Sequence, residues 1–418
     1  MILMVFTKSY PYDFSPEYAF LHREVHFLAK KFDKVILIPR VGSGHMFDVP
    51  PGVEVDESLS SFIRKKSNIL DFLANVLNSK SLYQEIRFYP SILFSPAKLL
   101  KLILFSGRME IKKNWIRNWL AEHQHDDSNI ILYSYWFDDI LLSLGSIKQT
   151  NPGIRLVSRA HGYDIYEELY FPYYWPCRQL TLPALDKLFP ASEDGANYFK
   201  AKYPRFAPIA EAAHLGVEDP GGRSTPSTDN TYRIVSCAHL VSLKRIGLLL
   251  KGIVLAARLR PQQNFEWIHF GGGKEQKTLE RIAQRDQNPN LKIRFTGNVP
   301  NKQILLHYTE HPVDVFINVS KTEGGAPVSI QEAISCGIPV IATAVGGNPE
   351  IVSQRNGILL EADPTPDEIA NAIFQLLDNP EMTARKRRGS REVWSEQYNA
   401  DVNFHLFADR LKSIREDQ

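Results

Sequence analysis

The sequence predicts an α/β protein with two doubly wound domains that face a central cleft. Short apolar runs typical of strands alternate with helix-like runs along most of the 418 residues. One stretch at 217–231 is rich in Pro, Gly, Ser and Thr and divides the chain into two halves of similar size. The length also exceeds what a single core usually holds. In such domains ligands bind outside the carboxyl ends of the strands.

The first half is predicted to contain at least four strands and an early helix. An apolar run at 2–7 indicates a buried strand, and apolar residues at helical spacing at 16–31 indicate the helix. Three further apolar runs, each bounded by turn residues, are expected to be strands. They lie at 35–39, 129–133 and 154–158.

The second half repeats this pattern after the predicted linker. Expected strands lie at 232–237, 265–270, 292–296, 313–319 and 339–342. We therefore expect an N-terminal Rossmann-like domain at 1–216, a linker at 217–231 and a second Rossmann-like domain at 232–394. A final helix at about 395–418 has an apolar spacing that suits packing against another surface.

Composition excludes several classes of protein. The chain has 49 Lys and Arg against 47 Asp and Glu, and neither half is basic enough to form a nucleic-acid footprint. Cys177, Cys237 and Cys336 stand far apart, which predicts neither a disulfide scaffold nor a zinc site. The sequence has no secretory signal pattern and no long apolar span. We expect a cytoplasmic protein, either free or resting on a membrane.

The segment 59–120 is locally basic. It holds eleven basic and three acidic residues, a net charge of +8, mixed with leucines and with Trp115 and Trp119. Two interpretations remain open. Basic residues with Leu and Trp anchors can lie in an anionic membrane interface, but ordinary helices with a solvated basic face have the same composition.

The stretch from Asn318 to Val352 carries the strongest chemical signal. A predicted strand ends in a loop containing Glu323, and a helix begins near Val328 with Glu332 one turn in. The start of a helix offers unpaired N–H groups to a phosphate, and ionised carboxylates accept hydrogen bonds from sugar hydroxyls. The alternative is a plain loop-to-helix connection with exposed Glu caps.

The same stretch resembles the signature of the retaining GT-B glycosyltransferases of family 4, called glycosyl transferases group 1. The residues that carry the likeness are Cys-Gly-Ile-Pro-Val-Ile-Ala-Thr at 336–343, Gly346-Gly347 and Glu350. The resemblance implies a GT-B fold, with Glu323 on the donor sugar and Glu332 on the ribose of the nucleotide. Eight residues separate these two glutamates where the family has seven. The loop between them is expected to contact the donor through Gly324, Gly325, Ala326, Pro327 and Val328.

Three more motifs resemble donor-binding segments of this family. Lys244 stands at the Lys position of an Arg-x4-Lys clamp for the diphosphate, and His239 occupies the Arg position. Arg245 is expected to assist the clamp. Glycine-rich and Thr-Gly-Asn segments are expected to line the nucleotide pocket. The residues concerned are Gly272, Gly273 and Asn298.

In the first half, Arg159-Ala-His161-Gly-Tyr-Asp164 resembles a motif of polysaccharide-assembly members, where the His lies near the donor sugar. Arg159, His161 and Asp164 are expected to project into the cleft. Other polar and aromatic residues are either acceptor contacts or parts of the domain's packing. They are Tyr10, Glu17 and Trp136, and Asp164 is likewise a candidate acceptor contact.

The resemblance therefore implies a retaining hexosyltransferase that uses a nucleoside diphosphate sugar, with His161, Lys244 and Glu323 as catalytic residues. No Asp-x-Asp pair occurs in the sequence, so we expect no metal and no cofactor. The expected acceptor is a saccharide, lipid-linked, in exopolysaccharide or lipopolysaccharide assembly at the inner face of the cytoplasmic membrane. Two alternatives stay open: a nucleotide-sugar epimerase of GT-B fold, and a non-catalytic nucleotide-sugar-binding protein.

Overall fold

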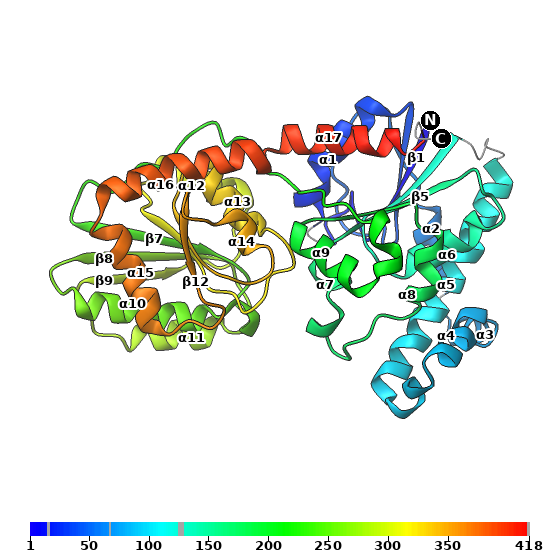
Figure 1. Ribbon diagram of the computed structural model, residues 1–418, viewed down its shortest axis with the longest axis horizontal. Coiled ribbons are helices and arrows are strands. Elements are labelled where there is room, and N and C mark those ends of the chain that lie inside the picture. The colour runs from blue at the N-terminus through cyan, green and yellow to red at the C-terminus, as the bar shows by residue number, and fades with distance from the viewer. Residues whose placement is uncertain (15–16, 67, 124–128, 416–418) are drawn as a thin grey trace. The chain divides into compact units, whose positions relative to one another are not determined.

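The computed structural model describes residues 1–14, 17–66, 68–123 and 129–415. The chain divides into two compact units (Figure 1). Unit 1 comprises Met1–Ala213 with Phe404–Gln418, and unit 2 comprises His214–Asn403. The segment predicted as a linker, 217–231, thus lies inside unit 2. Its backbone is bonded there, since the Ser224 N–H donates to the Cys336 carbonyl at 2.8 Å.

Unit 1 contains a six-stranded parallel sheet in the order β3-β2-β1-β4-β5-β6. Its strands are β1 (Ile2–Thr7), β2 (Lys34–Pro39), β3 (Val53–Val55), β4 (Ile130–Ser134), β5 (Arg155–Ala160) and β6 (Lys187–Pro190). The α-helices are α1 (Tyr18–Lys31), α2 (Ser58–Lys65), α3 (Ile69–Leu77), α4 (Lys80–Phe88), α5 (Pro96–His123), α6 (Asp139–Lys148), α7 (Gly162–Ile165), α8 (Arg178–Thr181) and α9 (Glu193–Lys202). Short 3-10 turns are η1 (Pro90–Phe94), η3 (Glu167–Leu169), η4 (Leu182–Ala184) and η5 (Pro204–Ile209).

Both faces of this sheet are buried, which explains the uninterrupted apolar runs of its strands. In β1, Leu3 and Val5 belong to one core cluster, whereas Met4 and Phe6 belong to another on the opposite face. All four side chains are at most 2% exposed. A parallel sheet covered by helices on both sides requires this pattern, and the predicted doubly wound architecture is confirmed.

Unit 2 has a second six-stranded parallel sheet, in the order β12-β11-β10-β7-β8-β9. Its strands are β7 (Thr231–Cys237), β8 (Asn264–Phe270), β9 (Leu291–Phe295), β10 (Val315–Asn318), β11 (Val340–Thr343) and β12 (Gly357–Leu360). Its helices are η6 (Ser242–Lys244), α10 (Ile246–Leu259), α11 (Gln276–Gln284), α12 (Asn301–Glu310), α13 (Val328–Ser335), α14 (Asn348–Ile351), α15 (Pro366–Leu377), α16 (Pro380–Val393) and the π-helix η7 (Trp394–Tyr398).

Each sheet reverses its strand order once. The reversal lies between β1 and β4 in unit 1 and between β7 and β10 in unit 2. At such a point, the loops that follow the two neighbouring strands run in opposite directions and leave an opening between them. Doubly wound sheets bind their ligands in this opening.

The last helix, α17 (Ala400–Ser413), brings the chain back to unit 1 at Phe404. The Phe407 ring contacts Tyr133 at a centroid distance of 5.7 Å and Phe189 at 5.2 Å. Arg410 donates to the Ala212 carbonyl at 3.0 Å. The C-terminal residues 404–415 therefore complete one core of unit 1.

The expected strands all occur within a few residues of their predicted limits, but β3, β6 and β12 were not predicted. Each of the three has only three or four residues. The predicted helix at 16–31 corresponds to α1, which begins at Tyr18, and residues 15–16 lie outside the described residues.

Three side chains lie in the core where the sequence suggested an exposed role. Arg159 is fully buried and pairs with Glu24 at 3.0 Å, so it does not project into a cleft. Trp115 and Trp119 are each 4% exposed, and their indole N–H groups donate to Ser58 and Asp56. They anchor α5 to unit 1, and the interpretation of these two residues as membrane anchors is wrong.

Candidate active site

The predicted donor residues of unit 2 follow the two strands that flank its reversal point. Lys244 ends the η6 turn after β7, and Glu323 lies in the loop after β10. Glu332 lies on α13, the helix that this loop enters. The Cys237 thiol at the end of β7 feels the charges of both Glu332 and Lys244. The fold thus brings these side chains to one edge of the sheet.

Lys244 and Glu323 form an ion pair. The Lys244 ammonium donates to Glu323 Oε1 at 2.6 Å, and the Asn318 amide donates to the same oxygen at 3.2 Å. The Glu323 side chain is 9% exposed and that of Lys244 is 26% exposed. Since an ammonium has three donors, Lys244 keeps N–H groups for an anion while its carboxylate partner holds it in place.

Glu332 is a buried carboxyl with one described partner. Its Oε1 accepts a hydrogen bond of 2.6 Å from Asn301, the first residue of α12. Burial raises the pKa of Glu332 to about 7, and the bond from Asn301 opposes this only in part. A carboxyl in this position changes charge near neutral pH and has lone pairs left for hydroxyl donors.

The loop from Glu323 to Pro327 is held by the backbone of Gly346 and Gly347. Gly346 has a φ of +49°, and a Cβ there would lie 1.8 Å from the Glu323 carbonyl oxygen. A Cβ on Gly347 would lie 2.2 Å from the Gly325 carbonyl carbon. The Gln331 amide also donates to the Ala326 carbonyl at 2.9 Å. Only glycine permits this approach, so the pair fixes the course of the loop despite its additional residue.

Helix α13 starts at Val328 directly after Pro327, the N-cap residue. Neither a side-chain cap nor an acidic residue in the first turn neutralises this end. The positive end of the helix dipole therefore stays available to an anion.

The loops after β8 and β9 are joined through the other predicted nucleotide residues. The Gly272 N–H donates to Asn298 Oδ1 at 2.8 Å, and the Gly271 N–H donates to the Gly297 carbonyl at 2.9 Å. A Cβ on Gly273 would lie 2.5 Å from the Leu240 carbonyl oxygen, so this glycine allows the β7 and β8 loops to touch.

The other two predicted clamp residues are Arg245 and His239. Arg245 donates to the carbonyls of Val319, Ser320 and Ala362 and pairs with Asp363 at 2.8 Å, so its guanidinium fastens the end of β10. This geometry does not support a donor contact by Arg245. His239 is exposed at the surface.

In unit 1, His161 follows β5 and lies among aromatic rings. Its ring centroid is 4.7 Å from that of Tyr135 and 4.6 Å from that of Trp136, and Nε2 is 3.1 Å from the Tyr135 carbonyl oxygen. Burial and the charge of Arg159 lower the pKa of His161 to about 3. The imidazole is therefore neutral at physiological pH and can act only through hydrogen bonds or packing.

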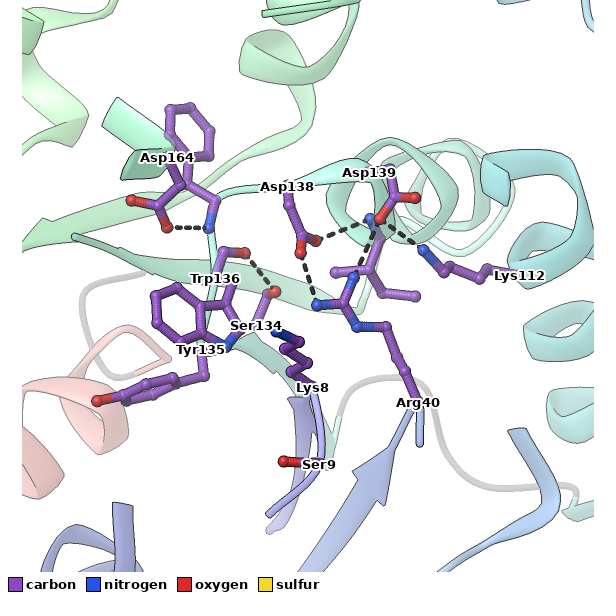
Figure 2. A network of polar contacts seen from close by, with 12 residues as sticks. Lys8, Ser9, Arg40, Lys112, Ser134, Tyr135, Trp136, Asp138, Asp139 and Asp164 are labelled. Atoms are coloured by element: carbon purple, nitrogen blue, oxygen red, sulfur yellow. Dashed lines mark hydrogen bonds and ion pairs between the residues drawn. The ribbon is translucent and has the colours of Figure 1, made fainter. Parts of the chain in front are cut away.

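Asp164, labelled in Figure 2, is a buried carboxylate that bonds to the backbone of His161. Its carboxylate accepts hydrogen bonds from the Phe137 N–H at 2.9 Å and the His161 N–H at 2.5 Å, and its side chain is fully buried. Asp164 therefore positions the β4 and β5 loops, and this burial replaces the acceptor contact that the sequence suggested.

Tyr10 and Glu17 are also buried. Glu17 accepts hydrogen bonds from the N–H groups of Lys8, Ser9 and Tyr10 and from the Trp136 indole. Tyr10 is fully buried in the core beside Tyr18. Both residues shape the loop after β1, so we assign them positioning roles. Trp136 is half-buried, and its role as an acceptor contact stays a prediction.

A charged network that was not predicted from the sequence lies at the same edge of unit 1 (Figure 2). Arg40 pairs with Asp138 at 2.8 Å and with Asp139 at 3.2 Å, and Lys112 pairs with Asp139 at 2.5 Å. Arg40 follows β2 and the two aspartates follow β4, so only the sheet order shows that they meet.

Two kinds of feature are absent from the described residues. No group of three or more His, Cys, Asp or Glu side chains there is arranged to hold a metal ion. Among the helices described, none is both long and apolar enough to cross a membrane.

Comparison with known proteins shows that part of the chain is similar to a known family. Residues 223–393 match the model of the glycosyl transferases group 1 family. A GDP-mannose-dependent monoacylated alpha-(1-6)-phosphatidylinositol monomannoside mannosyltransferase of Corynebacterium glutamicum is 27% identical over 197 residues, which are 46% of this chain and 49% of that protein. The chain thus spans about half the length of this relative.

A second relative aligns over more of the chain. The GDP-mannose-dependent alpha-(1-6)-phosphatidylinositol monomannoside mannosyltransferase of Mycolicibacterium smegmatis is 24% identical over 301 residues, covering 66% of this chain and 75% of that protein. Among solved structures, the lipopolysaccharide outer core galactosyltransferase WaaB aligns with a TM-score of 0.70 at 13% identity, covering 99% of both chains. This likeness confirms the predicted GT-B fold.

The close approach of Gly346 predicts a specific cost of adding a side chain. Gly346→Ala should lower the free energy of unfolding of unit 2 by about 1–2 kcal/mol for the positive φ and about 1–3 kcal/mol more for the clash. The matched control is Gly221→Ala, because Gly221 has a φ of +74° but a Cβ there would have no atom within 4 Å. Urea unfolding measures both variants. Equal destabilisation by the two substitutions would contradict the packing described here.

Proposed function

Because residues 223–393 are a glycosyl transferases group 1 domain, we propose that this protein transfers a sugar from a nucleoside diphosphate sugar to a saccharide acceptor. The product keeps the anomeric configuration of the donor. The observation that carries the proposal is the grouping of the Lys244–Glu323 ion pair and the buried Glu332 at the reversal point of the second sheet. The activities named for the two mannosyltransferase relatives are sugar transfers, which favours transfer over epimerisation or binding without turnover.

The three donor residues have separate roles in this proposal. Glu332 accepts hydrogen bonds from the ribose hydroxyls, and Glu323 orients the sugar. Lys244 and the N–H groups at the start of α13 stabilise the negative charge that builds on the leaving diphosphate. Charge-assisted bonds of this kind contribute about 1.5–3 kcal/mol each. Within the loop, Gly324, Gly325, Ala326 and Pro327 bring the backbone to the donor.

The acceptor side of the reaction is assigned to unit 1. We assign the contact with the sugar or the incoming hydroxyl to His161, and its low pKa restricts it to hydrogen bonding as a neutral ring. Trp136 offers an apolar face to a sugar ring. The leaving phosphate accepts the proton of the acceptor hydroxyl as the new glycosidic bond forms and the bond to the diphosphate breaks. The lack of an Asp-x-Asp pair in the sequence supports transfer without a metal ion.

We further propose that the acceptor is lipid-linked and that the protein works at the inner face of the cytoplasmic membrane. The named acceptors of the mannosyltransferase relatives are phosphatidylinositol mannosides, which supports a glycolipid class. The strongest support in unit 1 is α3. This helix packs on α5 through Phe72, whose ring lies directly against Gly107 of α5 and leaves no room there for a Cβ. The other side of α3 faces solvent.

The solvent side of α3 and its neighbours is apolar, and the same segment carries exposed basic residues. Exposed fractions are 68% for Ile69, 76% for Leu70 and 67% for Leu77 on α3, and 88% for Phe94 on η1. Exposed apolar groups of this size mark binding surfaces. Lys65, Lys80 and Arg87 are exposed in the same segment, and such a mixture suits an anionic membrane surface.

A thermal-shift screen of nucleoside diphosphate sugars tests the donor site. A true donor at 100 times its Kd should stabilise the protein by about 2.7 kcal/mol, which raises Tm by about 5–10 °C for a unit of this size. Lys244→Gln and Glu332→Gln should each reduce the shift, because each loses a charge-assisted contact, whereas Lys251→Gln, at an exposed lysine on α10, should keep it. The site assignment fails if both site variants keep the full shift.

The raised pKa of Glu332 predicts a pH-dependent affinity. Ribose hydroxyls bind the carboxylate, and Glu332 changes from mostly protonated at pH 6 to mostly ionised at pH 8 around its pKa of about 7. The affinity for a nucleoside diphosphate sugar should therefore rise about tenfold over this interval. Calorimetric titration measures it, and this ligand has no phosphate that titrates there. The pH dependence should vanish in Glu332→Gln; a slope that persists in this variant comes from another group.

Sedimentation with phosphatidylglycerol vesicles tests the membrane contact. Lys65→Gln with Lys80→Gln should weaken partitioning by about 2 kcal/mol, roughly thirtyfold, and Leu70→Ser with Leu77→Ser should also weaken it. The matched apolar control is Ile282→Ser on α11, which is 46% exposed in unit 2. Unchanged sedimentation of both double variants would refute the contact through 59–120.

A further inference from the structure

A cavity of about 630 Å³ lies at the carboxyl edge of the first sheet. Residues that follow four different strands line it: Lys8 after β1, Arg40 after β2, Asp138 after β4 and Tyr163 after β5. Helix α5 forms another wall. The cavity therefore lies over the reversal point between β1 and β4, where a doubly wound sheet binds its ligand.

The charges on the inner wall compensate one another. Arg40 and Lys112 are paired with Asp138 and Asp139 as drawn in Figure 2, so two cations meet two carboxylates. Burial lowers the pKa of Arg40, but the two aspartates raise it by more, and the guanidinium stays charged. This neutral, rigid group forms the floor of the cavity.

Three further cations line the cavity without such compensation. Lys8, Lys101 and Arg108 form no ion pair within the described part of the chain, and Lys101 lies 4.3 Å from the centroid of the Trp175 ring. Burial, together with the nearby Arg178, lowers the pKa of Lys101 to about 8. The cavity thus has a net charge of +3 when its floor and these three residues are counted together, which suits a ligand with several negative charges.

The remaining wall is apolar. Ile63 on α2 and Leu104, Phe105 and Ile111 on α5 line it. Leu104 is 37% exposed, and Leu100, one turn earlier on α5, is 57% exposed. An apolar path therefore leads out of a cationic cavity along α5. A free inorganic anion would make no favourable contact with the apolar wall. A phosphate attached to a hydrocarbon chain would contact both the apolar wall and the cations.

We propose that this cavity binds the diphosphate group of a lipid-linked acceptor, with Lys8, Lys101 and Arg108 on the phosphates and the first part of the hydrocarbon chain along Leu104 and Leu100. This inference rests on the proposed function. The acceptor saccharide then extends past Tyr163 to Trp136 and His161. The Tyr163 and Trp136 rings are 5.1 Å apart, so these aromatic groups form a continuous surface from the cavity to the histidine.

Calorimetric titration of the full-length protein with geranyl diphosphate, a short water-soluble prenyl diphosphate, tests the site. Lys101→Gln with Arg108→Gln should weaken binding at least about tenfold, because two charge-assisted contacts are lost. Both side chains are partly or fully exposed, so the fold tolerates their replacement. Arg117→Gln, at an exposed position of the same helix outside the cavity, is the matched control and should bind as the unmodified protein does.

Two further arms separate this site from other sources of phosphate binding. Inorganic diphosphate should bind at least about tenfold more weakly than geranyl diphosphate, since it lacks the contact with the apolar wall; equal affinity would overturn the lipid-linked assignment. Lys244→Gln should leave geranyl diphosphate binding unchanged. If this variant loses binding and the Lys101/Arg108 variant does not, the ligand occupies unit 2, and the inference fails while the donor site stands. Absence of binding to the unmodified protein would also overturn it.

Discussion

Burying a carboxyl group raises the free energy of the folded state unless hydrogen bonds or ion pairs compensate for its lost hydration. The second unit buries two carboxyl groups at one edge of its sheet. Glu323 is compensated by Lys244 and Asn318. Among the described residues, Glu332 has one hydrogen-bond partner, the Asn301 amide. This bond compensates only in part for burial, so the pKa of Glu332 is raised to about 7. A fold rarely keeps such a group for stability, because an apolar side chain of similar size would pack as well. The arrangement is understandable if a ligand with hydroxyl and phosphate groups supplies the missing partners. Gly346 and Gly347 contribute to the same site, because their backbone packs against the loop between the two carboxylates and fixes its conformation.

The first unit manages charge in another way. Arg159 and Glu24 form an ion pair in its interior. The carboxylates of Glu17 and Asp164 accept hydrogen bonds from backbone N–H groups of the loops after β1, β4 and β5. These residues make the sheet edge rigid. In the function we propose, the groups that contact the ligand are the half-buried Trp136, the neutral His161 and the cations around the cavity. Preorganised groups of this kind bind a substrate without reorganising when it arrives. The proposed acceptor path therefore has an aromatic section for a saccharide and a cationic section for phosphate.

Most of the fold could be predicted from the sequence because the buried strands are continuous apolar runs. The strands that escaped, β3, β6 and β12, are short, and a run of three or four residues has no visible period. For the donor residues, the motif around Gly346 and Pro339 predicted that Glu323 and Glu332 lie near a helix start. The role of Asn301 could not be predicted, because its contact with Glu332 depends on how α12 and α13 lie side by side. No motif in the sequence around Asn301 indicates this contact. The cationic cavity escaped for the same reason, since Lys8, Arg40 and Lys101 come from three distant elements. Trp115 and Trp119 show the opposite error: aromatic residues beside basic ones suggested a membrane anchor, yet their indoles pack in the core of unit 1.

The central claim is that one edge of the second sheet binds a nucleoside diphosphate sugar through Lys244, the start of α13 and Glu332. A crystal structure of the protein soaked with the donor identified by thermal shift tests it most directly. The account predicts both ribose hydroxyls within hydrogen-bonding distance of the Glu332 carboxylate, about 2.5–3.0 Å, and the diphosphate beside Lys244 and the N–H groups of Val328 and Ser329. Electron density for the nucleotide at any other place, with Glu332 still bonded only to Asn301, would contradict it.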